Sequence, residues 1–293
     1  MADTPFSFVI LTFNEEEHLP RLLESIIGLS APVYIADSGS TDGTLEVIKK
    51  YGATVAYNKF VNHPKQWDFA LKHFAINTPW TIGLDADQIV TVELFQLLKK
   101  LKNEDVPENV HGIYFNRKNY FKGKWIRHGG YFPKYLLKMF RTGIGRSDLN
   151  QNMDHRFVVP GETIIWKNGY LIEENLKENS IHSWIDKHNR YSTLQAKEEL
   201  ERKSGMRLPG NQPKLLGNPD QRMAWFKQIW FKAPLFVRPM FYFTYRYFFQ
   251  LGFLDGKEGF IFHFLQAFWY RLIIDIKIDE GQKDLVKEVK SHS

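Results

Sequence analysis

Short apolar runs followed by polar residues recur along the first 90 residues of the chain. They cover Phe6–Thr12, Val33–Ala36 and Pro79–Leu84. Continuous apolar runs of this length are typical of strands that are buried on both faces. The pattern therefore predicts a sheet whose strands lie inside an α/β domain.

Helical spacing separates these runs. After the first run, apolar side chains repeat along one helix face, at Leu19, Leu22, Leu23, Ile26 and Ile27. Asn14, with Glu17 three residues later, has the pattern of a helix cap. After the second run, the small and polar segment Ser38–Gly43 predicts a sharp turn into a helix that carries Leu45 and Ile48. Two successive βα units predict a parallel sheet with a ligand crevice at its carboxyl edge.

The third apolar run delivers two carboxylates, Asp85 and Asp87, at its end. Mg²⁺ and Mn²⁺ take oxygen ligands and are usually shared between one or two carboxylates and substrate phosphates. The pair therefore predicts a site for a divalent cation and a diphosphate. An Asp-x-Asp also occurs in ordinary solvated loops, so its meaning depends on the segments around it.

A further helix is predicted to start at Pro64, with Trp67, Ala70 and Phe74 at core spacing. Lys65 lies in its first turn, where a cation opposes the helix macrodipole. Two interpretations stay open at this point. Lys65 contacts an anionic diphosphate at the helix N-terminus, or it is a solvated surface lysine.

Three segments taken together resemble a known family. They are similar, in order, spacing and residue types, to the successive nucleotide-sugar motifs of family-two glycosyltransferases. The segments are Val9–Glu15, Asp37–Thr44 and Asp85–Asp87. The resemblance implies an α/β fold of the GT-A type, Rossmann-like, with a mostly parallel central sheet flanked by helices. It also implies a glycosyltransferase of the hexosyltransferase type that uses a nucleotide-diphosphate-sugar donor and inverts the anomeric carbon.

The same resemblance assigns roles to individual residues. Thr12, Phe13 and Glu15 would line the base and ribose pocket, and Asp37 would hydrogen-bond the base. Asp85 would face the ribose or the metal. Asp87 would ligate the metal, Mn²⁺ or Mg²⁺, and Lys65 would contact the diphosphate. UDP is the expected nucleotide, with GDP and dTDP still open.

An inverting transfer needs a base that deprotonates the acceptor hydroxyl. The expected base is Asp154, in the polar segment that follows the predicted strand 135–140. His155 or Asp148 could take the role instead, because relatives place a His-Glu pair where this chain has Asp154-His155. A structural ion pair between Asp154 and Arg156 is the competing interpretation.

The C-terminal part has a different pattern. Trp225 to Tyr270 hold 19 of the 45 aromatic residues. Basic residues punctuate the segment, at Lys227, Lys232, Arg238, Arg246, Lys257 and, just beyond it, Arg271. Rings with interspersed cations favour interfacial helices in an anionic membrane, and no apolar run of about 20 residues predicts a span. A helical subdomain or an oligomer interface is the alternative.

The chain is predicted to hold a catalytic domain, residues 1–210, and a C-terminal amphipathic helical region, residues 211–293, because proline and glycine cluster between 205 and 219. The segment Gly252–Phe260 resembles a tail of bacterial family-two enzymes that build lipopolysaccharide core or exopolysaccharide. That likeness implies a lipid-linked saccharide acceptor. We expect a peripheral enzyme at the cytoplasmic face of the bacterial inner membrane, since no secretory signal is visible.

Composition narrows the classes of function. The absence of cysteine excludes disulfides and thiolate metal sites. The net charge of +6 accompanies aromatic rings without a groove-reading helix or an RNA-binding signature, so nucleic acid is not an expected partner. A nucleotidyltransferase and a non-catalytic membrane-bound sugar-binding scaffold are the alternative functions. The pattern does not determine the sugar, the linkage or the oligomeric state.

Overall fold

The computed structural model describes residues 4–150, 155–203 and 212–291. The chain forms two compact units, Met1–Tyr120 with Pro133–Leu176 and Phe121–Phe132 with Lys177–Ser293. These units are not divided at residue 210, where the sequence predicts a domain boundary. The long helix α5 (Ile181–Lys203) belongs to the second unit because it packs against helix α9 (Tyr270–Ser291). The extent of the catalytic domain stays a prediction.

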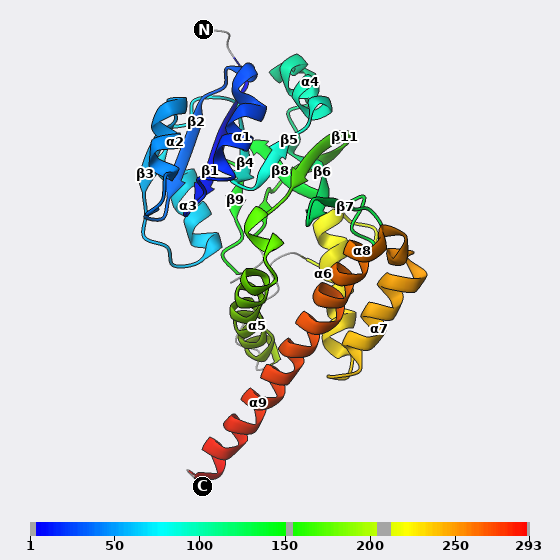
Figure 1. The fold of residues 1–293 in the computed structure, drawn as a ribbon. Helices are drawn as coiled ribbons and strands as arrows, with labels where there is room; N and C mark the ends of the chain where they lie inside the picture. The colour runs from blue at the N-terminus through cyan, green and yellow to red at the C-terminus, as the bar shows by residue number, and fades with distance from the viewer. Residues whose placement is uncertain (1–3, 151–154, 204–211, 292–293) are drawn as a thin grey trace. The chain divides into compact units, whose positions relative to one another are not determined.

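The first half of the first unit is a parallel sheet (Figure 1). Its strands are β1 (Phe6–Thr12), β2 (Val33–Asp37), β3 (Thr54–Tyr57) and β4 (Trp80–Asp85), in the order β3-β2-β1-β4. The connecting helices are α1 (Leu19–Ile26), α2 (Thr44–Tyr51) and α3 (His63–His73). Every residue of β1 is buried, as its unbroken apolar run predicts.

The second half makes the sheet mixed. Strand β8 (Tyr135–Arg141) lies between β4 and β6 (Val110–Phe121) and runs antiparallel to both. Strand β11 (Glu162–Glu173) is parallel to β6, and β5 (Gln88–Val90) pairs antiparallel with β11. The prediction of a mostly parallel sheet is therefore corrected to a mixed one. An apolar run indicates burial, but strand direction depends on which strands become neighbours.

Shorter elements complete the first unit. They are α4 (Val92–Lys100), the antiparallel pair β9 (Arg146–Ser147) and β10 (Phe157–Val158), and the 3₁₀ turns Ile27–Leu29, Asn103–Asp105 and Leu176–Asn179, the last of which runs from the first unit into the second.

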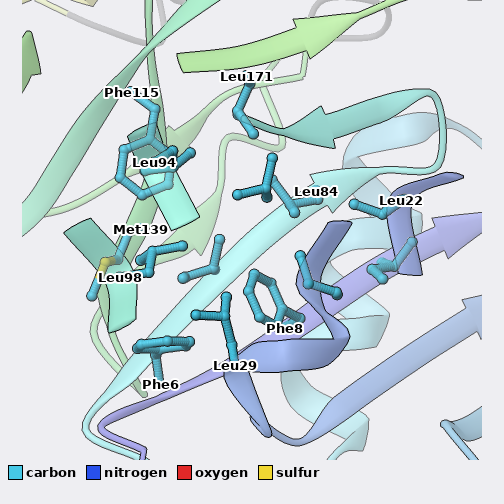
Figure 2. Packing of buried hydrophobic residues seen from close by; sticks show 14 of the residues in the cluster. Phe6, Phe8, Leu22, Leu29, Leu84, Leu94, Leu98, Phe115, Met139 and Leu171 are labelled. Carbon is cyan, nitrogen blue, oxygen red and sulfur yellow. The ribbon is translucent and has the colours of Figure 1, made fainter. Parts of the chain in front are cut away.

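Alternate residues of the strands supply two cores. Phe6, Phe8 and Ile10 of β1 join a cluster with residues of α1 and α4, part of which Figure 2 shows. Val9 and Leu11 point to the other face, where they pack with Trp67 of α3. Burying a large apolar side chain contributes about 1.5–3 kcal/mol. The two core layers therefore hold the strands in place, and with them the polar residues at the strand ends.

The second unit is helical, apart from strand β7 (Lys124–Ile126). Besides α5 and α9 it contains α6 (Pro219–Lys232), α7 (Arg238–Thr244), α8 (Gly256–His263), the π-helical turns Tyr245–Phe249 and Phe264–Trp269, and the 3₁₀ turn Gly252–Asp255. Trp184, Phe262, Tyr270 and Ile274 are among the residues of its core. Among the described residues, no helix combines the length and the apolar character needed to cross a membrane.

The Gly252–Phe260 segment is folded into a 3₁₀ turn and the start of α8. Asp255 is buried and accepts hydrogen bonds from the backbone N–H of His128 at 2.9 Å and from its ring Nδ1 at 2.7 Å. A Cβ on Gly252 would lie 2.6 Å from the ring Nε2 of His263, and one on Gly129 would lie 2.0 Å from its Cε1. The glycines are therefore required by the close approach of a buried histidine.

Candidate functional site

The carboxyl ends of three neighbouring parallel strands bring the predicted site residues together. Thr12 at the end of β1 lies opposite Asp37 at the end of β2, and Leu11 lies opposite Asp85 at the end of β4. The three motifs, far apart in sequence, thus meet at one edge of the sheet. In open α/β sheets this edge is where ligands bind.

Asp37 organises the loop that follows its own strand. Its Oδ1 accepts from the backbone N–H groups of Gly39 and Ser40 at 2.8 and 2.9 Å. Its Oδ2 accepts from the hydroxyls of Thr12 at 2.8 Å and Ser40 at 2.6 Å. A carboxylate offers about four acceptor sites. All four are used here, so a hydrogen bond from Asp37 to a nucleotide base requires one of these contacts to be exchanged.

The loops after β1 and β2 are tied to each other. Asn14 has a left-handed backbone, with φ of 56°, and its Oδ1 accepts from the backbone N–H of Thr41 at 2.7 Å. The hydroxyl of Ser40 accepts from the backbone N–H of Asn14 at 2.8 Å. Helix α1 begins only at Leu19, with His18 at its N-cap position. The predicted cap at Asn14 is therefore wrong, because its side chain bridges two loops instead.

Glu15 and Phe13 have different surroundings. The Glu15 carboxylate Oε2 lies 2.6 Å from Nδ1 of His18, which is 1% exposed. The backbone N–H of Leu176 donates to the other ring nitrogen of His18 at 2.8 Å. Since that nitrogen accepts, Nδ1 carries the proton and donates to Glu15. Phe13 is 54% exposed and presents its ring at the surface next to the strand edge.

Asp85 is held by two cationic or ionisable partners. Lys138 of β8, itself 6% exposed, places its Nζ 2.8 Å from Oδ2, and Nε2 of His63 lies 3.5 Å from Oδ1. Burial alone would raise the pKa of the Asp85 carboxyl, but Lys138 and His63 outweigh it and hold that pKa well below its usual range. Asp85 is therefore ionised at neutral pH.

A second half-buried carboxylate, that of Glu173, is linked to Asp85 through Gln88. The side-chain amide of Gln88 donates to Oε2 of Glu173 at 3.0 Å, and its carbonyl accepts from the backbone N–H of Asp85 at 3.2 Å. Arg117 contacts Oε1 of Glu173 at 2.5 Å. Burial raises the pKa of Glu173, yet Arg117 and Gln88 lower it further than burial raises it. Gln88 of β5 thus links the backbone of the Asp-x-Asp segment to an ion pair between Arg117 of β6 and Glu173 of β11.

The fit to a divalent cation rests on oxygen ligands alone. In the described parts of the chain, no three His, Asp or Glu side chains gather as a metal centre. Asp87 is half-buried in the turn between β4 and β5, and one oxygen of Asp85 already faces Lys138. These residues fit Mg²⁺ or Mn²⁺ if a substrate diphosphate completes the ligand set, as is usual for hard cations.

The remaining predicted residues are partly placed. Lys65 is exposed in the first turn of α3, where its backbone N–H donates to the capping side chain of Asn62 at 2.9 Å. Asp154 lies outside the described residues. His155 stands with its ring 5.5 Å from that of His63 and stacked on Trp67 at 5.3 Å. Asp148 is buried, and its Oδ1 accepts from the backbone N–H of Asn150 at 3.0 Å.

Sequence reasoning missed Lys138, His63, His18 and the pair formed by Arg117 and Glu173. One signal was available for Lys138, which interrupts the apolar run 135–140, since a lysine is almost never fully buried unless it is paired. Nothing local identifies its partner. The contact to Asp85 exists because β8 is the sheet neighbour of β4.

The α/β fold, with polar residues at the carboxyl ends of three neighbouring parallel strands, is of the class that binds ligands at this edge of the sheet. The chain belongs to glycosyl transferase family 2, whose family model matches residues 7–157. This confirms the resemblance drawn from the three motifs, and the α/β fold with its mixed sheet is GT-A-like.

The chain is similar to three known proteins. The lipopolysaccharide core biosynthesis glycosyltransferase LpsC of Rhizobium meliloti is 30% identical over 205 residues, which cover 67% of this chain and 72% of LpsC. The succinoglycan biosynthesis protein ExoA of the same organism is 30% identical over 97 residues, covering 32% of this chain and 28% of ExoA. The crystal structure of S. aureus TarS 1-349 in complex with UDP is 13% identical, with a TM-score of 0.43, and covers 95% of this chain and 91% of that chain.

Proposed function

We propose that this glycosyltransferase moves a sugar from a nucleotide-diphosphate donor, expected to be a UDP-sugar, to a lipid-linked or lipopolysaccharide-type saccharide, with inversion at the anomeric carbon. One observation carries the proposal. The adjacent carboxyl ends of three parallel strands bring Thr12, Asp37 and Asp85 to one edge of the sheet of a family-2 domain.

The nucleotide would lie across this edge. Thr12, Phe13 and Glu15 would line the base and ribose pocket, where the exposed Phe13 ring offers a flat apolar surface. Asp37 would accept a hydrogen bond from the base by exchanging one of its contacts with Ser40. The tied loops hold these groups in place before the donor arrives, which reduces the entropy lost on binding.

Asp85 and Asp87 would hold Mn²⁺ or Mg²⁺ together with the donor diphosphate. A bound divalent cation supplies charge stabilisation to the departing nucleotide diphosphate. Lys138 adds a second positive charge on the Asp85 side, and Lys65 is free to approach the diphosphate from the start of α3. Asp85, kept ionised by its partners, is in the form a metal ligand needs.

Asp154 would deprotonate the acceptor hydroxyl, with His155 or Asp148 as the alternatives. The neighbourhood supports this segment, because His155 packs against His63, which contacts Asp85. Asp154→Asn is expected to retain donor binding and lose turnover. Full turnover in Asp154→Asn with a loss in His155→Gln would move the role to His155.

The names of two relatives support the proposed acceptor class. LpsC is named for lipopolysaccharide core biosynthesis and ExoA for succinoglycan biosynthesis, so a saccharide of the bacterial envelope is the favoured acceptor. We place the enzyme peripherally at the cytoplasmic face of the inner membrane, where activated sugars and lipid-linked saccharides meet.

The test is a panel of UDP-, GDP- and dTDP-sugars, measured for binding and hydrolysis with Mn²⁺, with Mg²⁺ and with chelator. We expect one preferred donor, metal dependence, and a loss of about a thousandfold in turnover for Asp87→Ala, equivalent to about 4 kcal/mol of charge stabilisation. Asp68→Ala, which removes only an exposed ion pair with Lys72, is the matched control. Wild-type turnover in Asp87→Ala would remove that residue from the mechanism.

A further inference from the structure

An exposed set of rings lies on the second unit. We name it the aromatic face and define it by Phe241, Tyr245, Phe248, Phe249, Phe253, Phe260 and Phe264, which are between 38% and 77% exposed. Phe249 at 77% and Phe241 at 71% are the most exposed of them. Contiguous apolar surface of this kind is rare on a protein that meets only water.

Ring contacts join four members of the face, Phe248, Phe253, Phe260 and Phe264. The ring of Tyr247 lies 5.1 Å from Phe248, 6.3 Å from Phe253 and 5.7 Å from Phe260. Phe260 lies 6.1 Å from Phe264. Residues from the π-helical turn 245–249, the 3₁₀ turn 252–255 and helix α8 therefore share one surface. The face is built on packed elements rather than on a loose tail.

Basic side chains outnumber acidic ones in the segment that carries the face. Between residues 221 and 270 the only acidic side chains are Asp255 and Glu258. Asp255 is buried against His128, and Glu258 faces Lys124 at 3.7 Å. Lys232 and Lys257 are exposed. The surface therefore presents rings and cations, which complements the anionic headgroups of a bilayer.

Other cations of this segment are not available to lipid. Arg238 is 3% exposed and donates to Asp275 at 2.8 Å and to Glu199 at 2.8 Å. Arg246 donates to the carbonyl of Gly129 at 2.7 Å, and its guanidinium lies 4.4 Å from the ring of Tyr131. Arg271 stands against the rings of Trp230 and Tyr242. Three of the six basic residues expected at the membrane thus have structural roles.

We infer that the aromatic face inserts into the headgroup region of an anionic bilayer, and that ring burial contributes more to its affinity than charge. Aromatic side chains favour this boundary because one end is apolar and the other tolerates water. A second copy of the chain fits less well. A symmetric contact would place Lys257 of both copies in the same interface, where the neighbouring Glu258 already faces Lys124. The inference rests on the proposed function in that a lipid-linked acceptor is presented at a membrane.

The experiment is flotation of the full chain with vesicles of phosphatidylcholine alone and of phosphatidylcholine with phosphatidylglycerol at 3:1. Wild-type protein is expected to bind both, more tightly with the anionic lipid. Phe241→Ser with Phe249→Ser should lower partition at least tenfold on both vesicles. Lys232→Gln with Lys257→Gln should lower it about threefold, on the anionic vesicles alone. Phe60→Ser, which removes a ring that is 54% exposed in the first unit, is the matched control.

Several outcomes would overturn the inference. Unchanged partition in the double phenylalanine variant would do so, as would binding that requires phosphatidylglycerol and vanishes at 0.5 M salt. A shift from dimer to monomer in sedimentation, without loss of vesicle binding, would assign the face to self-association. Donor hydrolysis without vesicles separates the two proposals. If it persists while partition fails to respond, this inference alone falls. If vesicle binding behaves as expected but no donor is turned over, the proposed function falls.

Discussion

The strand edge of the first unit and the aromatic face of the second unit differ in which side chains are buried and which are exposed. At the strand edge, large apolar residues such as Ile10 and Leu84 are fully buried, while Asp85 at the end of β4 keeps 30% of its side chain exposed. In the second unit, Arg238 is buried while Phe249 is 77% exposed. The first arrangement is that of an enzyme site supported by a core. The second arrangement is that of a surface suited to contact an apolar partner instead of water.

In both regions a buried cation is stabilised by carboxylates instead of by water. Lys138 and Arg238 are both nearly inaccessible cations; Lys138 is paired with one carboxylate, Asp85, and Arg238 with two. At the strand edge the partner, Asp85, keeps 30% of its side chain exposed, so the pair serves a site. In the second unit the partners Glu199 and Asp275 are as buried as Arg238, so the cluster serves packing.

The largest expected effect is on the buried cluster. Arg238→Met should destabilise the second unit by ~3–5 kcal/mol, because Glu199 and Asp275 would remain buried without a counter-charge. Urea unfolding measures the loss. Arg222→Met, which changes an exposed arginine of α6, should stay within about 0.5 kcal/mol. A small loss in Arg238→Met would show that the cluster is not structural, and the contrast between the two regions would weaken.

Lys138→Met should have an intermediate, pH-dependent effect. In the wild-type protein the Asp85 pKa is depressed, so its contribution to stability is present above the unfolded value of about 3.9 and is lost as pH falls through the folded pKa. Without Lys138, burial dominates and the Asp85 pKa rises. The variant should then lose ~1–3 kcal/mol at pH 7, and the difference should shrink toward pH 4.

Melting temperatures of wild-type protein and Lys138→Met between pH 4 and 8 test that sign. Lys138→Arg should recover much of the stability, because it restores the charge beside Asp85. A loss in Lys138→Met that is equal at every pH would indicate a packing defect rather than an electrostatic one.

The smallest expected effect on stability is at the aromatic face. Phe249→Ser removes a ring that contributes little to the folded core, so the free energy of unfolding in water should change by less than about 0.5 kcal/mol. Thermal unfolding without lipid is the measurement. Loss of more than ~2 kcal/mol would mean that the ring packs against the protein. Large apolar side chains would then stabilise the fold in both regions.

Local patterns predicted the strands and helices that bear the motifs. The run Phe6–Thr12 became β1 with the expected bounds, and Val33 to Asp37 became β2. The cap at Asn14 was misassigned, because its left-handed backbone and its bond to Thr41 depend on a loop 27 residues away. The aromatic segment was recognised, but cations with opposite fates, buried at Arg238 and exposed at Lys257, look alike in a sequence.

The sequence by itself determined the family, the α/β class and the polar residues that end each of the three strands, since apolar runs and turn chemistry act over neighbouring residues. Only the tertiary structure decided that the sheet is mixed and that Lys138 neutralises Asp85. It also decided that Arg238 is buried and that Arg246 donates to Gly129, while Phe241 and Phe249 remain exposed. Those outcomes depend on contacts between residues far apart in the chain, and such contacts form only when one particular set of elements packs together.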